Sequence, residues 1–434
     1  MTYSPVDVVE VCAWGKTIGA VALDPATGYY AFEYDTDWVR QGSELAPLQM
    51  PNHAGVFVFP ELNRQTYYGL PALLADALPD RFGNALVNRW MAENGVPVNA
   101  ISALDRLAYA SDRAMGALEF RPPAGAPSPD ATAVQLADLV VAARSNVAGD
   151  LTTTDDTQEA LRQLIQVGTS AGGARAKAVI AFNSETGQVR SGHESATTGF
   201  DQWIVKLDGV TGNGRSGDLD SDAQGFGKIE YAYHLMALAG GIEMSESRLL
   251  PEGPRTHFLT KRFDRDQDGS KLHLQSLCAL AHLDFNLTGA HSYAQYLEVV
   301  NSLGLDAESR NQAFRRMVFN VAALNRDDHT KNLAFLRPNN GEWRLAPAFD
   351  LTYSYNPDGQ WTAQQQMSVN GKTEGIGISD LRIVGDRFQV PGHNAAIAEV
   401  LEAIQRWDEF AQIAGVESNV IAAITKDLAR HRPQ

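Results

Sequence analysis

NRDDHTKN, residues 325–332, decides the fold of this chain. It follows a run whose apolar residues recur at helical spacing and is followed by the strand-like run LAFL. Asp327 and Asn332 are five residues apart, the spacing at which a kinase catalytic loop places its proton-accepting Asp and its metal-binding Asn. Asn325 stands where that loop has His. A capped helix end followed by a turn uses the same residue types, so the spacing alone leaves both interpretations open.

Further downstream, APAFDLTYSY places Asp350 just after an apolar run. A carboxylate at this position could hold Mg²⁺, a hard cation that favours oxygen ligands and substrate phosphates. His329 could orient the catalytic loop, but a purely structural hydrogen bond is an equally good explanation of that residue.

Two segments upstream could contact phosphates. GTSAGGARAK, residues 168–177, could bring backbone N–H groups close to a phosphate, although it matches neither a Walker A motif nor the kinase glycine loop. A flexible turn explains it as well. Lys206 lies inside the apolar strand QWIVKLD, and Glu230 on the following helix is its candidate partner. A solvent-facing lysine on an edge strand is the alternative.

These elements occur in the order of a kinase, and their combination is more informative than each alone. The segments GTSAGGARAK, IVKL, KRFDR, DDHTKN and FDL together closely resemble the HipA family of bacterial toxin kinases, and the likeness covers nearly the whole chain. The resemblance implies an ATP-dependent serine/threonine protein kinase that is the toxin of a type II toxin–antitoxin system. Its fold would be distantly related to eukaryotic protein and lipid kinases.

The resemblance also implies site residues. Asp327 would be the catalytic base, Asn332 and Asp350 would hold Mg²⁺, Lys206 would contact the ATP phosphates, and Ser170 matches the serine that the family autophosphorylates. The other residues expected at the nucleotide are Ala171, Gly172, Gly173, Lys177, Lys261, Arg262, Phe263, His329 and Lys331.

The expected partners follow from the family and from charge. Family members usually accompany a small DNA-binding antitoxin, HipB-like, and act on the translation machinery, notably aminoacyl-tRNA synthetases. The formal net charge of -16 argues against direct binding to nucleic acid, because a phosphate backbone attracts an excess of Lys and Arg. The chain shows no signal peptide and no apolar run long enough for a membrane span, and its two distant cysteines fit a reducing cytoplasm.

The pattern of the chain predicts an α+β fold with two lobes and a cleft between them. Residues 1–122 form a β-rich subdomain with a helix, 123–265 a linker and the kinase N-lobe, and 266–434 a mostly helical C-lobe. Within the last part, LQSLCALAHL reads as a helix, and a final pair of helices runs from about Ala395 to Arg430.

Two other functions remain open from the sequence. One is a kinase for a small molecule or a lipid headgroup, because the D-x-H-x-x-N pattern is also reminiscent of phosphoinositide kinases. The other is a nucleotide-sensing co-repressor that acts through a DNA-binding partner. A further motif, DRDQDG at residues 264–269, opens like an EF-hand calcium loop, but Gln275 replaces the bidentate Glu, which favours a solvated Asp-Gly turn.

Overall fold

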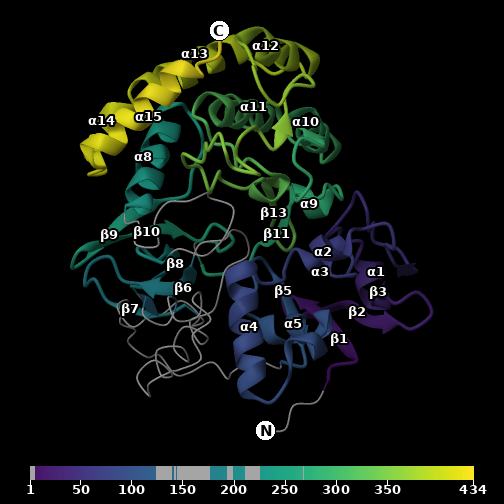
Figure 1. Cartoon of the computed structure of the whole chain (residues 1–434). Coiled ribbons are helices and arrows are strands. Elements are labelled where there is room, and N and C mark those ends of the chain that lie inside the picture. The colour runs from purple at the N-terminus through teal and green to yellow at the C-terminus, as the bar shows by residue number, and fades with distance from the viewer. Residues whose placement is uncertain are drawn as a thin grey trace. The chain divides into compact units, whose positions relative to one another are not determined.

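The computed structural model describes residues 5–123, 139–140, 143, 176–192, 199–210, 225–266 and 268–434 (Figure 1). By its internal contacts the chain divides into two compact units. Unit 1 comprises residues 1–213, 261–284 and 336–342, and unit 2 comprises residues 214–260, 285–335 and 343–434.

The N-terminal sheet of unit 1 has five antiparallel strands in the order β4-β3-β2-β1-β5. Val9 and Val11 of β1 are fully buried on its inner face. Gly19 lies so close to the neighbouring strand that a Cβ there would stand 2.2 Å from the carbonyl oxygen of Glu33, so this position needs glycine. The strands are β1 (Val8–Ala13), β2 (Lys16–Asp24), β3 (Tyr29–Tyr34), β4 (Val56–Phe57) and β5 (Leu118–Arg121).

Short helices accompany this sheet, and α4 and α5 lie beside it in Figure 1. The chain breaks at Pro79, and α4 then begins because the carboxylate of Asp80 accepts a hydrogen bond from the backbone N–H of Gly83 at 2.7 Å. The helices are α1 (Thr36–Gln41), α2 (Arg64–Tyr67), α3 (Ala72–Ala75), α4 (Arg81–Glu93), the 3-10 turn η1 (Val98–Ala100) and α5 (Ala103–Ala110).

Unit 1 also contains three strands of a second sheet. The fully buried strand β6 (Lys177–Phe182) pairs antiparallel with β7 (Val189–Ser191) on one side and β8 (Asp201–Lys206) on the other. Further along the chain, β11 (His273–Ser276) leads into the single-turn helix α9 (Leu277–Leu280).

Unit 2 begins with a long helix and a hairpin. The helix α8 (Phe226–Ala239) precedes the antiparallel strands β9 (Ser247–Glu252) and β10 (Arg255–Lys261). Gly227 brings α8 close to the hairpin, since a Cβ there would stand 3.1 Å from the carbonyl oxygen of Thr256.

The remainder of unit 2 is mostly helical, and α13 and α14 pack against α8 (Figure 1). Tyr233 of α8 is buried between Phe319 and Trp407, with ring centroids 6.0 Å and 5.5 Å away. The elements are β12 (His291–Ser292), α10 (Tyr293–Ser302), α11 (Ala307–Ala322), η2 (Thr330–Asn332), β13 (Ala334–Arg337), β14 (Arg344–Leu345), β15 (Met367–Ser368), α12 (Ile378–Arg387), α13 (His393–Gln405), α14 (Trp407–Ile413) and α15 (Ser418–Arg430).

The strands predicted for QWIVKLD and LAFL are confirmed as β8 and β13, and the helices predicted around Glu230 and before the catalytic loop are confirmed as α8 and α11. Two predictions are wrong. The supposed helix LQSLCALAHL begins as strand β11, because Ser276 caps a helix that starts only at Leu277. The final pair of helices is three, since the chain turns at Arg406 and again at Gly415, which has a φ of 72°. Within the described part of the chain, no helix has both the length and the hydropathy of a membrane span.

Candidate active site

The predicted catalytic loop of unit 2 lies between α11 and β13. The chain leaves α11 at Ala322 and returns to regular structure in the turn η2. The side-chain amide of Asn332 donates a hydrogen bond of 2.9 Å to the backbone carbonyl of Asp327, which closes the loop on itself. That bond uses the amide nitrogen of Asn332 and leaves its carbonyl oxygen as the atom suited to a metal ion.

Ser354 lies in the segment that follows Asp350, and its hydroxyl is hydrogen-bonded to the catalytic loop. Its hydroxyl oxygen accepts hydrogen bonds from the backbone N–H groups of Arg326 at 2.7 Å and Asp327 at 3.0 Å. The same hydroxyl donates to the side-chain oxygen of Asn325 at 3.2 Å. The backbone around Asp327 is therefore held by specific donors and acceptors.

The Asp327 carboxylate faces outward from this fixed backbone. Its side chain is 37% exposed, yet one oxygen, Oδ1, is buried and has no hydrogen-bond partner among the described residues. The imidazole Nε2 of His329 stands 3.8 Å from that oxygen, which is too long for a hydrogen bond. Phe285 supports the loop, with the His329 ring centroid 5.3 Å and the Lys331 ammonium 5.4 Å from its own ring.

Asp350 lies in the segment that meets this loop, and its φ of 58° is the left-handed conformation that Asp tolerates better than most residues. A small cavity of about 10 Å³, room for about one water molecule, separates the two segments. Its lining includes Asn332 and Leu333 from one segment and Phe349 and Leu351 from the other. The cavity is therefore lined by Asn332 and by the two chain neighbours of Asp350, whereas Asp350 itself is not among the lining residues.

The residues expected at the metal offer oxygen atoms, the kind of ligand that magnesium favours. The described residues include no group of three or more His, Cys, Asp or Glu side chains that could hold a metal ion. Magnesium takes few protein ligands and completes its shell with water and phosphate oxygens. An amide oxygen of Asn332 and a carboxylate of Asp350 are such a partial set.

Asp328 is a residue that sequence reasoning missed. It is 2% exposed and accepts hydrogen bonds from the Tyr293 hydroxyl at 2.6 Å, the Gln366 backbone N–H at 2.8 Å and the Gln365 amide at 3.0 Å. Asn320 in turn donates to the Tyr293 hydroxyl at 2.9 Å. Burial raises the pKa of Asp328 to about 6, even though these hydrogen bonds favour the charged form. The two consecutive aspartates, Asp327 and Asp328, were the feature of the sequence that could have pointed to this second residue.

The predicted phosphate-binding lysines lie in unit 1. Lys177 and Lys206 are directly opposite each other across β6 and β8, so their side chains share a face of the sheet. The Lys177 side chain is 5% exposed, and its ammonium stands 3.3 Å from the Asp80 carboxylate. A buried lysine beside another lysine needs such a counter-charge. The nucleotide contacts expected of both lysines stay predictions.

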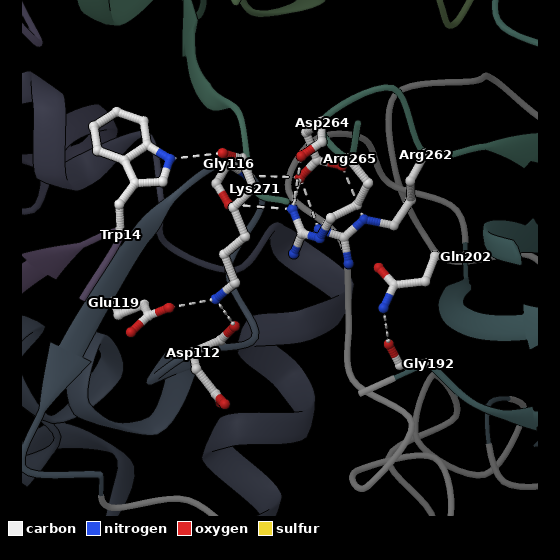
Figure 2. A network of polar contacts seen from close by, with 10 residues as sticks. All are labelled: Trp14, Asp112, Gly116, Glu119, Gly192, Gln202, Arg262, Asp264, Arg265 and Lys271. Atoms are coloured by element: carbon white, nitrogen blue, oxygen red, sulfur yellow. Dashed lines mark hydrogen bonds and ion pairs between the residues drawn. The ribbon is translucent and has the colours of Figure 1, made fainter. Parts of the chain in front are cut away.

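The KRFDR motif of unit 1 forms a network of buried charges (Figure 2). The carboxylate of Asp264 accepts hydrogen bonds from Arg262, Arg265 and the backbone N–H of Gly116, at 2.7–2.9 Å. The backbone N–H of Arg262 donates to the carbonyl of Gln202 in β8 at 2.9 Å. The side chain of Arg262 is thus engaged by Asp264, and the motif links β8 to the turn before β5.

The flanking residues of this motif have other surroundings. Lys261 is half-buried and pairs with Asp201 at 2.9 Å, and Phe263 is partly exposed. At the EF-hand-like segment, the first expected calcium ligand, Asp264, is held by arginines. The chain then makes a tight turn in which Gly269 donates to Asp266, as expected for a solvated turn.

Ser170, Ala171, Gly172 and Gly173 lie outside the described residues. The structure brings together Asp327, His329, Lys331, Asn332 and the Asp350 segment within unit 2, whereas Lys177, Lys206, Lys261, Arg262 and Phe263 belong to unit 1.

Comparison with known proteins decides the family. The model of the HipA-like C-terminal domain matches residues 169–432, and the model of the HipA N-terminal domain matches residues 9–121. The chain belongs to the HipA family.

One solved structure shares the fold expected of that family. HipA of Shewanella oneidensis MR-1, in a complex with HipB and operator DNA, is 16% identical, with a TM-score of 0.66 over 98% of this chain and 96% of that one. The likeness shows a HipA fold and confirms the predicted mixture of a β-rich N-terminal part and a helical C-terminal part. A proinflammatory kinase of Helicobacter pylori, CtkA, has a TM-score of 0.31 and 13% identity, and covers 53% of this chain and 91% of its own.

A protein of Haemophilus influenzae that is named as a kinase is 26% identical over 124 residues. The match covers 26% of this HipA-family chain and 36% of the relative, so the chain spans about a third of that relative's length.

Proposed function

We propose that this HipA-family chain is an ATP-dependent protein kinase that phosphorylates a Ser or Thr hydroxyl and serves as the toxin of a toxin–antitoxin pair. The observation that carries the proposal is the Asp327 carboxylate, which has a buried oxygen without a hydrogen-bond partner in the described chain, on a loop fixed by Ser354 and Asn332. A general base needs an acceptor of this kind within reach of the substrate proton.

In the proposed reaction, the acceptor hydroxyl donates a hydrogen bond to Asp327. Its oxygen then bonds to the γ-phosphorus of ATP as the bond from that phosphorus to the β-phosphate oxygen breaks, so that ADP leaves. Asp327 takes the hydroxyl proton. Because the backbone of Asp327 is already held by two hydrogen bonds, little reorganisation is needed when the substrate arrives.

Asn332 and Asp350 would hold the magnesium, which supplies positive charge to the phosphate oxygens when it is bound. Their segments line one small cavity, which supports this assignment. Lys206, opposite Lys177 across the sheet, would contribute a further cation to the phosphates. Lys177, the other predicted phosphate-binding lysine, stands 3.3 Å from the Asp80 carboxylate.

Three finer assignments complete the proposal. Ser170 would be the autophosphorylated residue, the partner would be a DNA-binding antitoxin resembling HipB, and the target would be a protein of the translation machinery such as an aminoacyl-tRNA synthetase. The Shewanella complex of HipA with HipB and operator DNA supports the expectation of an antitoxin.

The test identifies the molecule to which the γ-phosphate of ATP is transferred. A bacterial lysate is incubated with the purified chain and γ-labelled ATP, and the label is located by mass spectrometry. We expect it on Ser or Thr of a protein, and on Ser170 of the chain itself. Label on metabolites or lipids instead would overturn the protein-kinase assignment, and binding of ATP with no transfer would favour a nucleotide-sensing co-repressor.

A further inference from the structure

A cationic cavity of about 350 Å³ lies in unit 2 next to the catalytic loop. Three arginines line it, Arg326, Arg430 and Arg432, and Glu374 is the acidic side chain among the lining residues. In a chain with a formal net charge of -16, such a concentration of positive charge is unexpected. A cavity with this lining suits a ligand that carries negative charge.

We call this cavity, lined by Arg326, Arg430 and Arg432, the arginine pocket. Arg326 is the buried arginine of its lining. Arg326 is 9% exposed, one of its terminal nitrogens donates to the carbonyl of Ala363, and its guanidinium stands 4.5 Å from the centre of the Tyr355 ring. Its Nε is buried and has no hydrogen-bond partner in the described chain. A buried donor without a partner is costly, and a bound acceptor would relieve that cost.

His431 also lines the arginine pocket. Its ring packs edge-on against Tyr355, with centroids 4.8 Å apart, and its Nε2 is buried without a hydrogen-bond partner among the described residues. Burial and the charges of Arg326 and Arg430 lower the pKa of His431. An anion placed here would meet two buried groups that lack partners and two exposed arginines, Arg430 and Arg432.

We propose that the arginine pocket binds an acidic group, a carboxylate or a phosphate, carried by the protein segment that the kinase phosphorylates. The inference deepens the proposed function and rests on it for the identity of the ligand. The pocket would make the enzyme prefer acceptor hydroxyls that have an acidic residue nearby in sequence.

The substrate is the favoured source because of where the pocket begins. Arg326 directly precedes Asp327, and the Ser354 hydroxyl accepts from the backbone N–H groups of both, at 2.7 Å and 3.0 Å. An extended chain advances about 3.3 Å per residue. Two to four residues of a peptide therefore span about 7–13 Å, which is the separation that the proposal assigns to the acceptor hydroxyl and the acidic side chain.

The test measures binding without ATP, by calorimetry. The probes are a short peptide with glutamates flanking one serine, the same peptide with glutamines in their place, and inorganic phosphate. The test variant is Arg430→Gln with Arg432→Gln, since both arginines are exposed and their loss should leave the fold intact. The matched control is Arg382→Gln with Lys426→Gln, which removes the same charge from exposed positions of unit 2 outside the pocket.

We expect the wild type to bind the glutamate peptide about tenfold more tightly than the glutamine peptide, as for a charge-assisted contact. The test variant should lose that preference and the control should keep it. Equal binding of the glutamate peptide by wild type and test variant would overturn the proposal. Binding of inorganic phosphate without any preference for the glutamate peptide would also overturn it, because the pocket would then be a site for a free ion.

Phosphotransfer to the same two peptides separates this inference from the proposed function. A protein that binds the glutamate peptide through the pocket but transfers no phosphate would refute the kinase and keep the acidic-ligand site. A protein that phosphorylates both peptides equally well would keep the kinase and refute the pocket.

Discussion

Asp264 in unit 1 and Asp328 in unit 2 are both buried aspartates in conspicuous polar motifs, yet their surroundings have opposite effects. Burial alone would raise the pKa of Asp264, but the guanidinium groups of Arg262 and Arg265 outweigh it and hold that pKa below its usual range. The donors to Asp328 among the described residues are neutral, namely Tyr293, Gln365 and the Gln366 backbone, so burial prevails and its pKa rises to about 6. Partners, and not burial, therefore decide which carboxylate stays charged.

The difference separates two tasks. The arginine-paired Asp264 binds the turn before β5 and the backbone of Arg262 binds β8, which is a structural role for part of the KRFDR motif. Asp328 pairs with no cation in the described part of the chain and holds the loop that bears Asp327 against residues 365–366. The same residue type thus fixes a scaffold in one unit and positions a candidate catalytic group in the other.

The largest effect should come from breaking the charged cluster. Replacing Asp264 by Asn leaves the buried Arg262 and the partly buried Arg265 without their counter-charge, so the free energy of unfolding should fall by about 3–5 kcal/mol. Urea denaturation measures this, with Asp268→Asn, an exposed aspartate of the same segment, as the control. If the free energy of unfolding falls no further in Asp264→Asn than in the control, the charged cluster does not stabilise unit 1.

The next effect concerns Asp328. Asp328→Asn reverses at least one hydrogen bond but removes a buried carboxylate, so the cost at pH 7 should be smaller, about 1–2 kcal/mol. Because the loop around Asp327 would shift, phosphotransfer should fall roughly ten- to hundredfold while ATP still binds. Asp358→Asn, an exposed change in unit 2, is the control for both measurements. Unchanged transfer in Asp328→Asn would remove its positioning role.

The pH dependence should distinguish the two aspartates by sign. The folded-state pKa of Asp328 is raised, so its contribution to stability is present at acid pH and is lost as the pH rises from about 4 to about 6. The folded-state pKa of Asp264 is lowered, so its contribution is present above about pH 4 and is lost as the pH falls further. The cost of Asp328→Asn should therefore grow from pH 7 to pH 5, whereas the cost of Asp264→Asn should stay constant over that range. If the costs of the two substitutions change with pH in the same way, the opposite pKa shifts of Asp264 and Asp328 are contradicted.

A smaller change tests the hydrogen bonds to Asp328 one at a time. Tyr293→Phe removes the 2.6 Å bond, so stability at pH 7 should fall by about 1 kcal/mol. Because that bond favours the charged carboxylate, its loss should raise the pKa of Asp328 further. Carboxyl ¹³C chemical shifts followed during a pH titration measure this, and an unmoved or lowered pKa would show that the hydroxyl does not stabilise the carboxylate.

Much of the fold could be predicted, because strands such as QWIVKLD and the kinase-like spacing of Asp327 and Asn332 are local patterns. The start of the short helix at Leu277 could not be predicted, since it is set by the capping residue Ser276 and not by the apolar periodicity around it. Asp328 and Ser354 could not be assigned from sequence either. Their importance comes from hydrogen bonds to residues that are distant along the chain, and no local pattern reports those contacts.

The most direct measurement of the central claim is phosphotransfer by the Asp327→Asn variant, with the affinity for ATP measured on the same sample. Removing the proton acceptor should abolish transfer to Ser170 and to any target protein, whereas the affinity for ATP should stay within about twofold of the wild type. Full transfer by this variant would contradict the assignment of Asp327 as the catalytic base.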